Sequence, residues 1–241
     1  MEGLKQSLSN KKSIKEYLAE FFMLFFAVTL GFFAENIREK IADKEKSREL
    51  IEVVAKDLKS DLEMLQYLKE FENEKIKLCD TFKMMLTADP ATVDQKDYYR
   101  IVVGYSLFFV FNPTDKSRID AESKGYFLQD EYKELAYNIR KYNFWLGDYK
   151  ELDKLYVTHS QKYIYEIIPH ITDPEIFDQQ WRYPFPTLAS KKGIKPIDPE
   201  SIKKTMYYLS HSKIFMDTYK SDIDSMTHYA KMAIEIIEKN Q

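Results

Sequence analysis

The most apolar part of the chain is residues 21–34, fourteen positions without a charged side chain, between Glu20 and Glu35. At a helical rise of 1.5 Å per residue this run covers about 21 Å, and the longer segment 17–37 covers about 31 Å. The hydrocarbon core of a bilayer is about 30 Å thick, so 17–37 has the length of a transmembrane helix. The pattern therefore predicts a membrane span over 17–37.

Two other interpretations of this run remain open. One is a buried helix of a soluble protein, although such a helix normally keeps a polar side and this one has none. The other is a signal peptide, although its best cleavage point, after Ala34, has the bulky Phe32 three positions earlier, where a small residue is required.

Small residues gather on one face of the predicted span. A 4-3-4-3 spacing places five residues on that face: Glu20, Leu24, Ala27, Gly31 and Ala34. Small residues four apart let two helices approach closely in lipid, so this face is a candidate packing surface, while phenylalanines fill the flank. Glu35 is expected at the membrane interface. Glu20 lies either at the headgroup level or partly submerged and paired across a helix–helix contact.

The pattern after the span predicts only helices. Residues 38–49 are polar on nearly every side and indicate a solvated helical stalk. From residue 50 an apolar stripe at 3-4 spacing predicts a long amphipathic helix to about residue 86, which packs in a bundle or self-associates as a coiled coil. This stripe contains the following residues: Ile51, Val54, Leu58, Leu62, Leu65, Leu68 and Phe71.

Proline, glycine and capping residues divide the rest of the chain. We expect helices over 94–107, within 111–125 with Gly125 as the stop, and over 129–168, which Pro169 ends. The segments TDPEIF and IDPESI each place Asp before Pro, typical of a helix start, and the second predicts a final helix over 199–239. Residues 183–196 form a predicted loop. The fold class is therefore all-α: a basic leader (1–16), a span (17–37), a stalk (38–49) and an α-helical domain (50–241).

Composition narrows the functional classes. The 241 residues are 44% hydrophobic and 31% charged with a net charge of −3, and no basic patch with interleaved aromatics occurs, so no nucleic-acid partner is expected. The one cysteine, Cys79, excludes an internal disulfide and suggests a core thiol. Trp145 and Trp181 are expected to pack the bundle.

Candidate chemistry is sparse. Glu166/His170 and Asp224/His228 have a spacing that can place two metal ligands on one helix face, but Pro169 interrupts the first pair. No phosphate loop, nucleophile elbow or zinc-protease motif occurs. We therefore expect a protein that is not an enzyme, with no catalytic residue, no metal and no cofactor.

The charges on the two sides of the predicted span give only weak guidance on its orientation in the membrane. Basic residues before the span nearly balance those after it, from Arg38 to Arg48. A short leader remains in the cytoplasm more easily than a domain of about 200 residues, so we expect the N-terminus inside and the domain in the periplasm of an inner membrane.

Two stretches resemble a known family. AEFFMLFFAVTL followed by GFFAENIREK, in which Glu20, Gly31, Ala34 and Glu35 match, is similar to the N-terminal span of uncharacterised Bacteroidota single-pass membrane proteins. Asn36 and Arg38 match that pattern only with a shift of register, and Ile37 stands where the family has tryptophan. Residues 111–143 resemble the family's mid-chain pattern. The resemblance covers about 15–145 and implies a membrane-anchored helical domain without catalytic residues.

These expectations point to a structural or accessory protein in contact with lipid. It would form a homo-oligomer or dock on another membrane protein through the span and the bundle. The alternative is an extracytoplasmic helical module that senses a ligand and signals through a partner.

Overall fold

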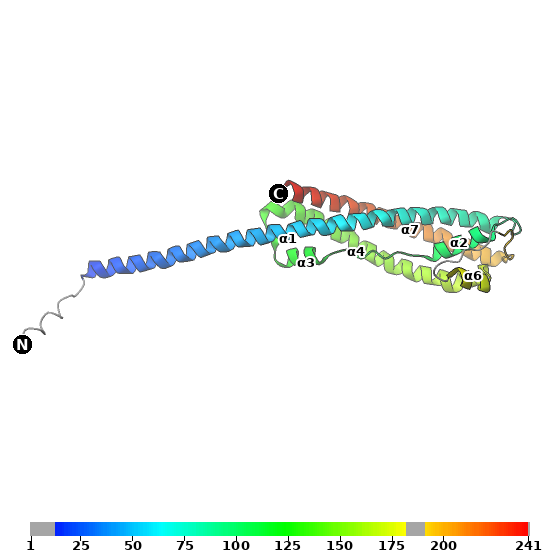
Figure 1. Ribbon diagram of the computed structural model, residues 1–241, viewed down its shortest axis with the longest axis horizontal. Helices are drawn as coiled ribbons and strands as arrows, with labels where there is room; N and C mark the ends of the chain where they lie inside the picture. Colours follow the sequence, from blue (N-terminus) through cyan, green and yellow to red (C-terminus); the bar gives the residue numbers. More distant parts are fainter. Residues whose placement is uncertain (1–12, 182–190, 241) are drawn as a thin grey trace, which may run out of the picture. The chain divides into compact units, whose positions relative to one another are not determined.

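A computed structural model describes residues 13–181 and 191–240, apart from the side chains of 179–181, and it is all-α as predicted (Figure 1). The leader up to residue 12, most of the 183–196 loop and the side chain of Trp181 lie outside the described residues. The chain divides into two compact units, one ending at Ile51 and one beginning at Glu52. Helix α1 (Ile14–Thr87) supplies residues to both, and each unit is described by itself below.

The second unit contains the remaining helices, most of them close to the predicted bounds. They are α2 (Gln95–Ser106), α3 (Lys116–Ser123), α4 (Lys133–Lys162), α5 (Ile168–Ile171), α6 (Pro174–Trp181) and α7 (Pro199–Lys239). Short 3-10 turns at Tyr126–Leu128 and Asp130–Tyr132, which the sequence pattern did not predict, precede α4. Both predicted Asp caps are confirmed: the Asp198 carboxylate accepts from Ser201 N at 2.9 Å, and the Asp173 carboxylate accepts from Glu175 N at 3.0 Å.

The buried seam of α1 differs from the predicted stripe. Beside the buried Ala55, one seam of buried positions in the second unit alternates strictly by four and three residues: Val54, Leu58, Asp61, Leu65, Leu68, Glu72, Lys75, Cys79, Phe82 and Leu86. The prediction placed Leu62 and Phe71 in the seam, but these are only half-buried. At these turns the regular 4-3 spacing of the helix, rather than the hydrophobicity of the side chains, decides which positions face the core. Charged residues at those positions are therefore buried.

Helices α1, α4 and α7 form the body of this unit. Asp61 and Lys75 of α1 contact Tyr142 and Tyr156 of α4, so these two helices run in the same direction. Helix α7 runs the opposite way, since its last turns lie beside the earlier part of α1: Lys59 pairs with Glu238 at 2.7 Å and Lys213 pairs with Asp80 at 3.1 Å.

Two parallel helices need a connection that returns the chain to its starting end. Here the extended segment 107–115, between α2 and α3, runs back along α1 (Figure 1). Its Leu107 carbonyl accepts a hydrogen bond from Lys75 Nζ at 2.6 Å, the Phe109 ring lies 5.3 Å from that of Tyr67, and Thr114 N donates to Asp61 at 2.9 Å. The segment is therefore held to α1 at both ends by buried charged side chains.

Asp61 is the more heavily used of these anchors. Its carboxylate accepts from Thr114 N, from Arg118 Nη1 at 3.1 Å and from Tyr142 OH at 2.8 Å, so it joins α1, the extended segment, α3 and α4. Arg118 is 1% exposed, and its guanidinium lies 4.8 Å from the centre of the Tyr142 ring. Removing one partner of a buried charge pair strongly destabilises the folded state, because the other charge remains desolvated.

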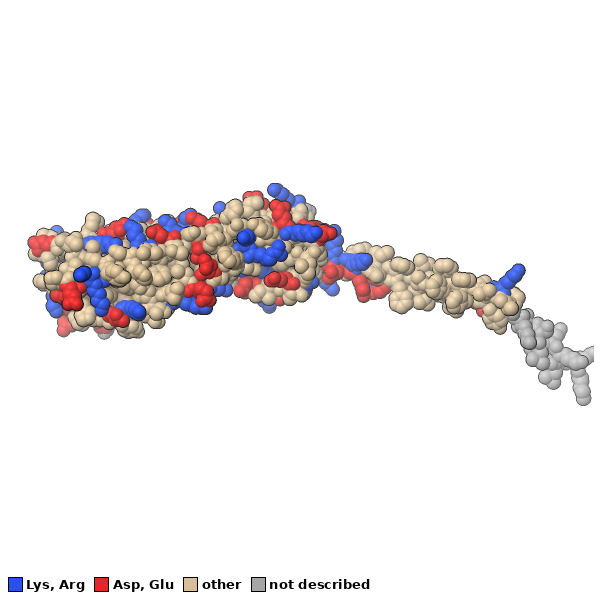
Figure 2. All heavy atoms as spheres, turned by 180° about the vertical axis from the view of Figure 1, so that it is seen from behind, with Lys and Arg blue, Asp and Glu red and all other residues tan. Residues whose placement is uncertain are grey.

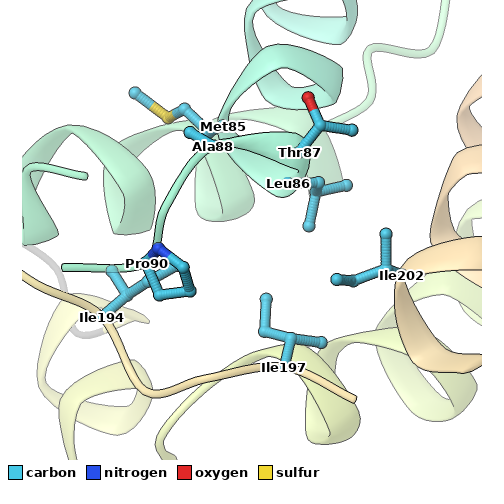
Figure 3. A pocket seen from close by; sticks show the side chains of 8 residues that line it. All are labelled: Met85, Leu86, Thr87, Ala88, Pro90, Ile194, Ile197 and Ile202. Atoms are coloured by element: carbon cyan, nitrogen blue, oxygen red, sulfur yellow. The ribbon is translucent and has the colours of Figure 1, made fainter. Parts of the chain in front are cut away.

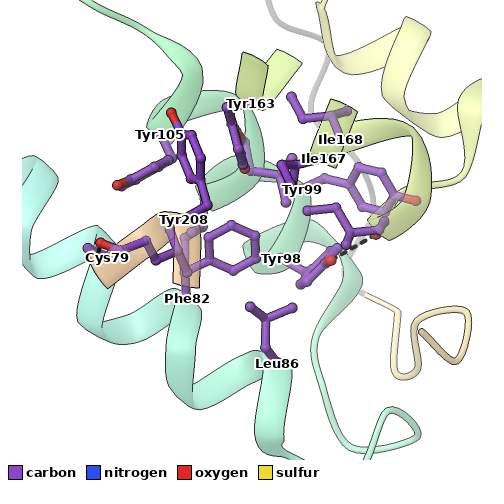
Figure 4. Packing of buried hydrophobic residues seen from close by; sticks show 14 of the residues in the cluster. Cys79, Phe82, Leu86, Tyr98, Tyr99, Tyr105, Tyr163, Ile167, Ile168 and Tyr208 are labelled. Carbon is purple, nitrogen blue, oxygen red and sulfur yellow. Dashed lines mark hydrogen bonds between the residues drawn. The ribbon is translucent and has the colours of Figure 1, made fainter. Parts of the chain in front are cut away.

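Tyrosines build much of the core where α1 ends (Figure 4). Rings of Phe82, Tyr98, Tyr105 and Tyr163 meet edge to face at centroid distances of 5.4–6.3 Å. Tyr98 OH donates to the Ile171 carbonyl at 2.8 Å, which ties α2 to α5. Cys79 is buried there, and burial raises the pKa of its thiol, consistent with the predicted core thiol.

Pro169 does not end the helix, contrary to the prediction. The chain passes from α4 through a π-helical turn, Tyr163–Ile167, into α5. In an α-helix the proline ring would clash with the carbonyl four residues earlier. The wider turn, in which Ile168 N bonds to Tyr163 O, accommodates the ring and lets the helical path continue to Ile171.

We predict that Arg118→Met lowers the free energy of unfolding of the bundle by about 3 kcal/mol, because Asp61 then remains buried without its cation. The control is Lys213→Met, which removes an exposed partner of Asp80 and should cost less than about 1 kcal/mol. Urea denaturation of the full chain in detergent, followed by circular dichroism, measures both. Equal, small losses would contradict the anchoring role of Asp61.

Candidate functional site

The N-terminal part of α1 is built as an isolated apolar helix. It starts at a capping box in which Ser13 N donates to Glu16 Oε2 at 2.7 Å and Glu16 N donates to Ser13 Oγ at 3.3 Å. An 18-residue window of α1 has a mean hydropathy of 1.9, and none of that window is buried. Among the described residues, α1 alone is long and apolar enough to cross a membrane, a property that signal sequences share.

Aromatic side chains cover one flank of this helix. Phe21 and Phe22 stack on Phe25 and Phe26 respectively, each pair at 6.3 Å between ring centroids. These rings are about half exposed or more, and Phe32 is 74% exposed. On the face seen in Figure 2, most of this helix carries no charged side chain. The hydroxyl of Thr29 donates to the Phe25 carbonyl at 2.7 Å, so the helix itself satisfies this polar group.

The five residues of the predicted packing face lie on the apolar helix. Leu24, Ala27, Gly31 and Ala34 are exposed, and Glu20 is half-buried. A Cβ added at Gly31 would meet nothing within 4 Å, so this position has room for an approaching helix.

Glu35 marks the end of the apolar run. Arg38 Nε donates to Glu35 Oε2 at 2.9 Å, and Arg38 Nη2 lies 2.5 Å from Oε1, a two-point contact on the helix surface. Such a pair is suited to the polar headgroup region, where both charges keep partial hydration.

A second feature, which the sequence analysis missed, is a polar centre in the bundle core. Glu72 and Lys75 are each 2% exposed. The Lys75 ammonium donates to Tyr156 OH at 2.5 Å and lies 4.9–5.6 Å from the ring centres of Phe71, Tyr105 and Tyr156. The Glu72 Oε2 atom has no hydrogen-bond partner within the described part of the chain.

Burial shifts the protonation of both groups. It raises the pKa of the Glu72 carboxyl to about 7, although the nearby Lys75 charge opposes this shift. It lowers the pKa of Lys75 to about 8, and the Glu72 charge again opposes. Burial likewise raises the pKa of Asp222 to about 6. This centre can store a proton near neutral pH, but its burial closes it to a substrate.

An apolar pocket of about 350 Å³ lies where α1 ends and α7 begins (Figure 3). The side chains of Leu86, Ile197 and Ile202 point into it, and Thr87 is the one polar residue among its described lining. Gly193 N donates to Val93 O at 2.9 Å and holds one wall in place. Gly193 has φ +94°, a conformation that favours glycine. The pocket can hold an apolar group but offers little to orient it.

By its spacing in the sequence, the Asp224/His228 pair is a possible set of metal ligands on one helix face. Asp224 pairs with Lys69 of α1 at 2.5 Å, and no group of three potential metal ligands occurs within 13–181 and 191–240. Comparison with family models, curated proteins and solved structures found no match. The resemblance of residues 15–145 to the Bacteroidota single-pass family therefore stays a prediction.

We predict that Glu72→Gln becomes more stable relative to the wild type as the pH rises from about 5 to about 8. The folded state keeps the Glu72 proton up to about pH 7, while the unfolded chain releases it near pH 4.5. The wild type therefore loses stability across this window, by roughly 2 kcal/mol, and the glutamine variant does not. Thermal unfolding at several pH values measures the difference.

The matched control is Glu74→Gln, two residues away, where the carboxylate is 67% exposed and pairs with Lys77. Its stability should follow the wild type at every pH. Parallel curves for wild type and Glu72→Gln would show that Glu72 is not held in a proton-retaining site.

Proposed function

We propose that this protein is a single-pass membrane protein, without enzymatic activity, that serves as a structural or accessory subunit of a membrane assembly. Residues 17–37 would form the anchor, and the helical domain would assemble as a homo-oligomer or dock on another membrane protein. The exposed apolar surface of α1 over residues 21–34 carries this proposal.

Transfer of the exposed apolar side chains of this helix from water to lipid is favourable. Six phenylalanines on the run are each at least half exposed: Phe21, Phe22, Phe25, Phe26, Phe32 and Phe33. Moving the exposed part of one such side chain out of water is worth about 1.5 kcal/mol, so the six together favour an apolar surrounding by about 9 kcal/mol. A span of about 31 Å for residues 17–37 also matches the thickness of the hydrocarbon core.

The packing face supports assembly within the membrane. Lipid gives apolar helices no hydrophobic reason to associate, so close packing and polar contacts decide whether they do. Gly31 has open space around it, and Glu20 on the same face offers a polar group. The phenylalanine flank suits contact with lipid.

The first prediction of this proposal concerns extraction of the protein from membranes. We expect the full chain to stay with membranes after washing at high salt and to need detergent for release, whereas a chain lacking residues 1–40 should be soluble and helical. Release of the full chain without detergent would contradict the anchor. Fractionation followed by circular dichroism of the truncated chain provides the measurement.

The second prediction concerns the packing face. Single cysteines in place of Leu24, Ala27 and Gly31 should crosslink between copies, or to a partner, more strongly than cysteines at 22, 26 and 33. Gly31→Leu should disrupt the association by steric clash, while Phe25→Leu should leave it intact. Stronger crosslinking through the phenylalanine positions would reverse the assignment of the faces, and a monomer with no recovered partner would refute assembly.

The third prediction concerns orientation. With the domain in the periplasm, a cysteine replacing the exposed Lys195 should react with a reagent that passes the outer but not the inner membrane of intact cells. The native Cys79 is buried and should stay silent. Reaction at residue 195 only after lysis would place the domain in the cytoplasm.

A further inference from the structure

A cleft of about 260 Å³ lies between α7 and the end of α4 with its π-helical turn. Its lining includes His159, Lys162, Glu166, Lys204 and Tyr208. All of them belong to the second unit, so the cleft stands independently of the membrane anchor.

The floor of the cleft is a rigid aromatic stack. The rings of His159 and Tyr208 are 4.0 Å apart and 7° from parallel, and Tyr163 stacks behind Tyr208 at 5.0 Å. Tyr208 OH donates to the His159 carbonyl at 3.1 Å, and His159 Nε2 lies 2.7 Å from Ser212 Oγ. These hydrogen bonds fix the rings, and because Tyr208 lies between His159 and Tyr163, the preformed flat surface that the stack offers to a ligand is the ring of His159.

The floor is uncharged at neutral pH. Burial, together with the charges of His211 and Lys162, lowers the pKa of His159 to about 4. A ligand resting on this stack therefore meets neutral π faces rather than an imidazolium.

The rim of the cleft carries a net positive charge. The Lys162 side chain is exposed and lines the cleft. Lys204 Nζ lies 3.9 Å from Glu166 Oε2 and 3.5 Å from the Glu166 carbonyl, a loose pair that leaves ammonium donors unused. Two lysines against one glutamate favour an anionic group over a cationic one.

The π-helical turn shapes one side of the cleft. Ile167, its last residue, lines the cleft, and Tyr163, its first, supports the floor. Pro169 prevents a regular α-helical turn here, as described above. Single π-turns inside α-helices occur frequently at functional sites.

We propose that this cleft binds a small planar aromatic carboxylate, with its ring on His159 at the end of the stack and its carboxylate between Lys162 and Lys204. A cavity of about 150 Å³ already holds a benzene ring, so the cleft has room for one substituted ring. Offset stacking on fixed rings favours a flat ligand, and the two ammonium groups favour an acid. The exposed Tyr207 ring also lines the cleft and stacks on that of His211, with 6.5 Å between the ring centroids.

Calorimetric titration of the full chain in mild detergent tests this proposal with three probes: benzoate, cyclohexanecarboxylate and benzyl alcohol. Benzoate should bind, cyclohexanecarboxylate should bind about tenfold more weakly for want of a flat ring, and benzyl alcohol should not bind for want of a charge. Equal binding of the two acids would overturn the stacking role. No binding of benzoate at concentrations up to about 10 mM would overturn the site itself.

Two variants of neighbouring residues locate the site. Lys204→Gln should weaken benzoate at least about fivefold, whereas Lys203→Gln removes the same charge from an exposed position outside the lining and should leave the affinity unchanged. Both positions are exposed, so neither change should unfold the bundle. Any benzoate that the detergent takes up affects the two variants equally and does not change the comparison. Equal effects of the two variants would show that benzoate binds elsewhere.

Discussion

Fourteen consecutive residues without a charge, on a helix exposed on every side, impose the main physical constraint on this protein. Water around residues 21–34 would leave six phenylalanine rings hydrated, and the described part of the chain offers no surface that covers them. An apolar surrounding removes this cost. The backbone tolerates such a surrounding because a helix satisfies its own polar groups, and the Thr29 hydroxyl is likewise bonded within the helix. The proposed location in a membrane rests on this constraint, and so does the proposal that the small-residue face is where copies or partners assemble.

The bundle depends on a different constraint, the return of the chain between two parallel helices. Asp61 and Lys75, both in the buried seam of α1, fasten the two ends of the extended segment 107–115. Polar residues at seam positions lower stability but specify which elements pair and in what register. Glu72, between them in the same seam, lacks such a partner and instead keeps a proton close to neutral pH. The core thus contains two charged groups, those of Asp61 and Lys75, that fasten the extended segment, together with the Glu72 carboxyl group, whose pKa burial raises to about 7.

The sequence was sufficient to predict where most helices begin, because capping residues act locally. Asp94, Asp173 and Asp198 begin helices as expected, and Gly125, with φ 72°, follows α3. Burial at Asp61, Glu72 and Lys75 was not predicted, since a search for apolar residues passes over charged ones. Counting along the sequence from Val54 in alternating steps of four and three residues reaches all three positions. This regular spacing was the signal in the sequence from which their burial could have been predicted. The cleft between α4 and α7 could not be predicted, because His159 and His211 lie far apart in the sequence and meet only through packing. The π-turn at Tyr163–Ile167 also depends on tertiary packing around Pro169.

The most direct measurement of the central claim is water accessibility along α1. Single cysteines at successive positions from 17 to 40, in membranes opened to both sides, would be treated with a water-soluble thiol reagent. A membrane span predicts an unbroken stretch of protected positions covering 21–34 on all faces of the helix, with reaction resuming beyond Glu35. Reactivity that recurs every three to four residues through this stretch would show a helix packed on one side in water, and would contradict the account.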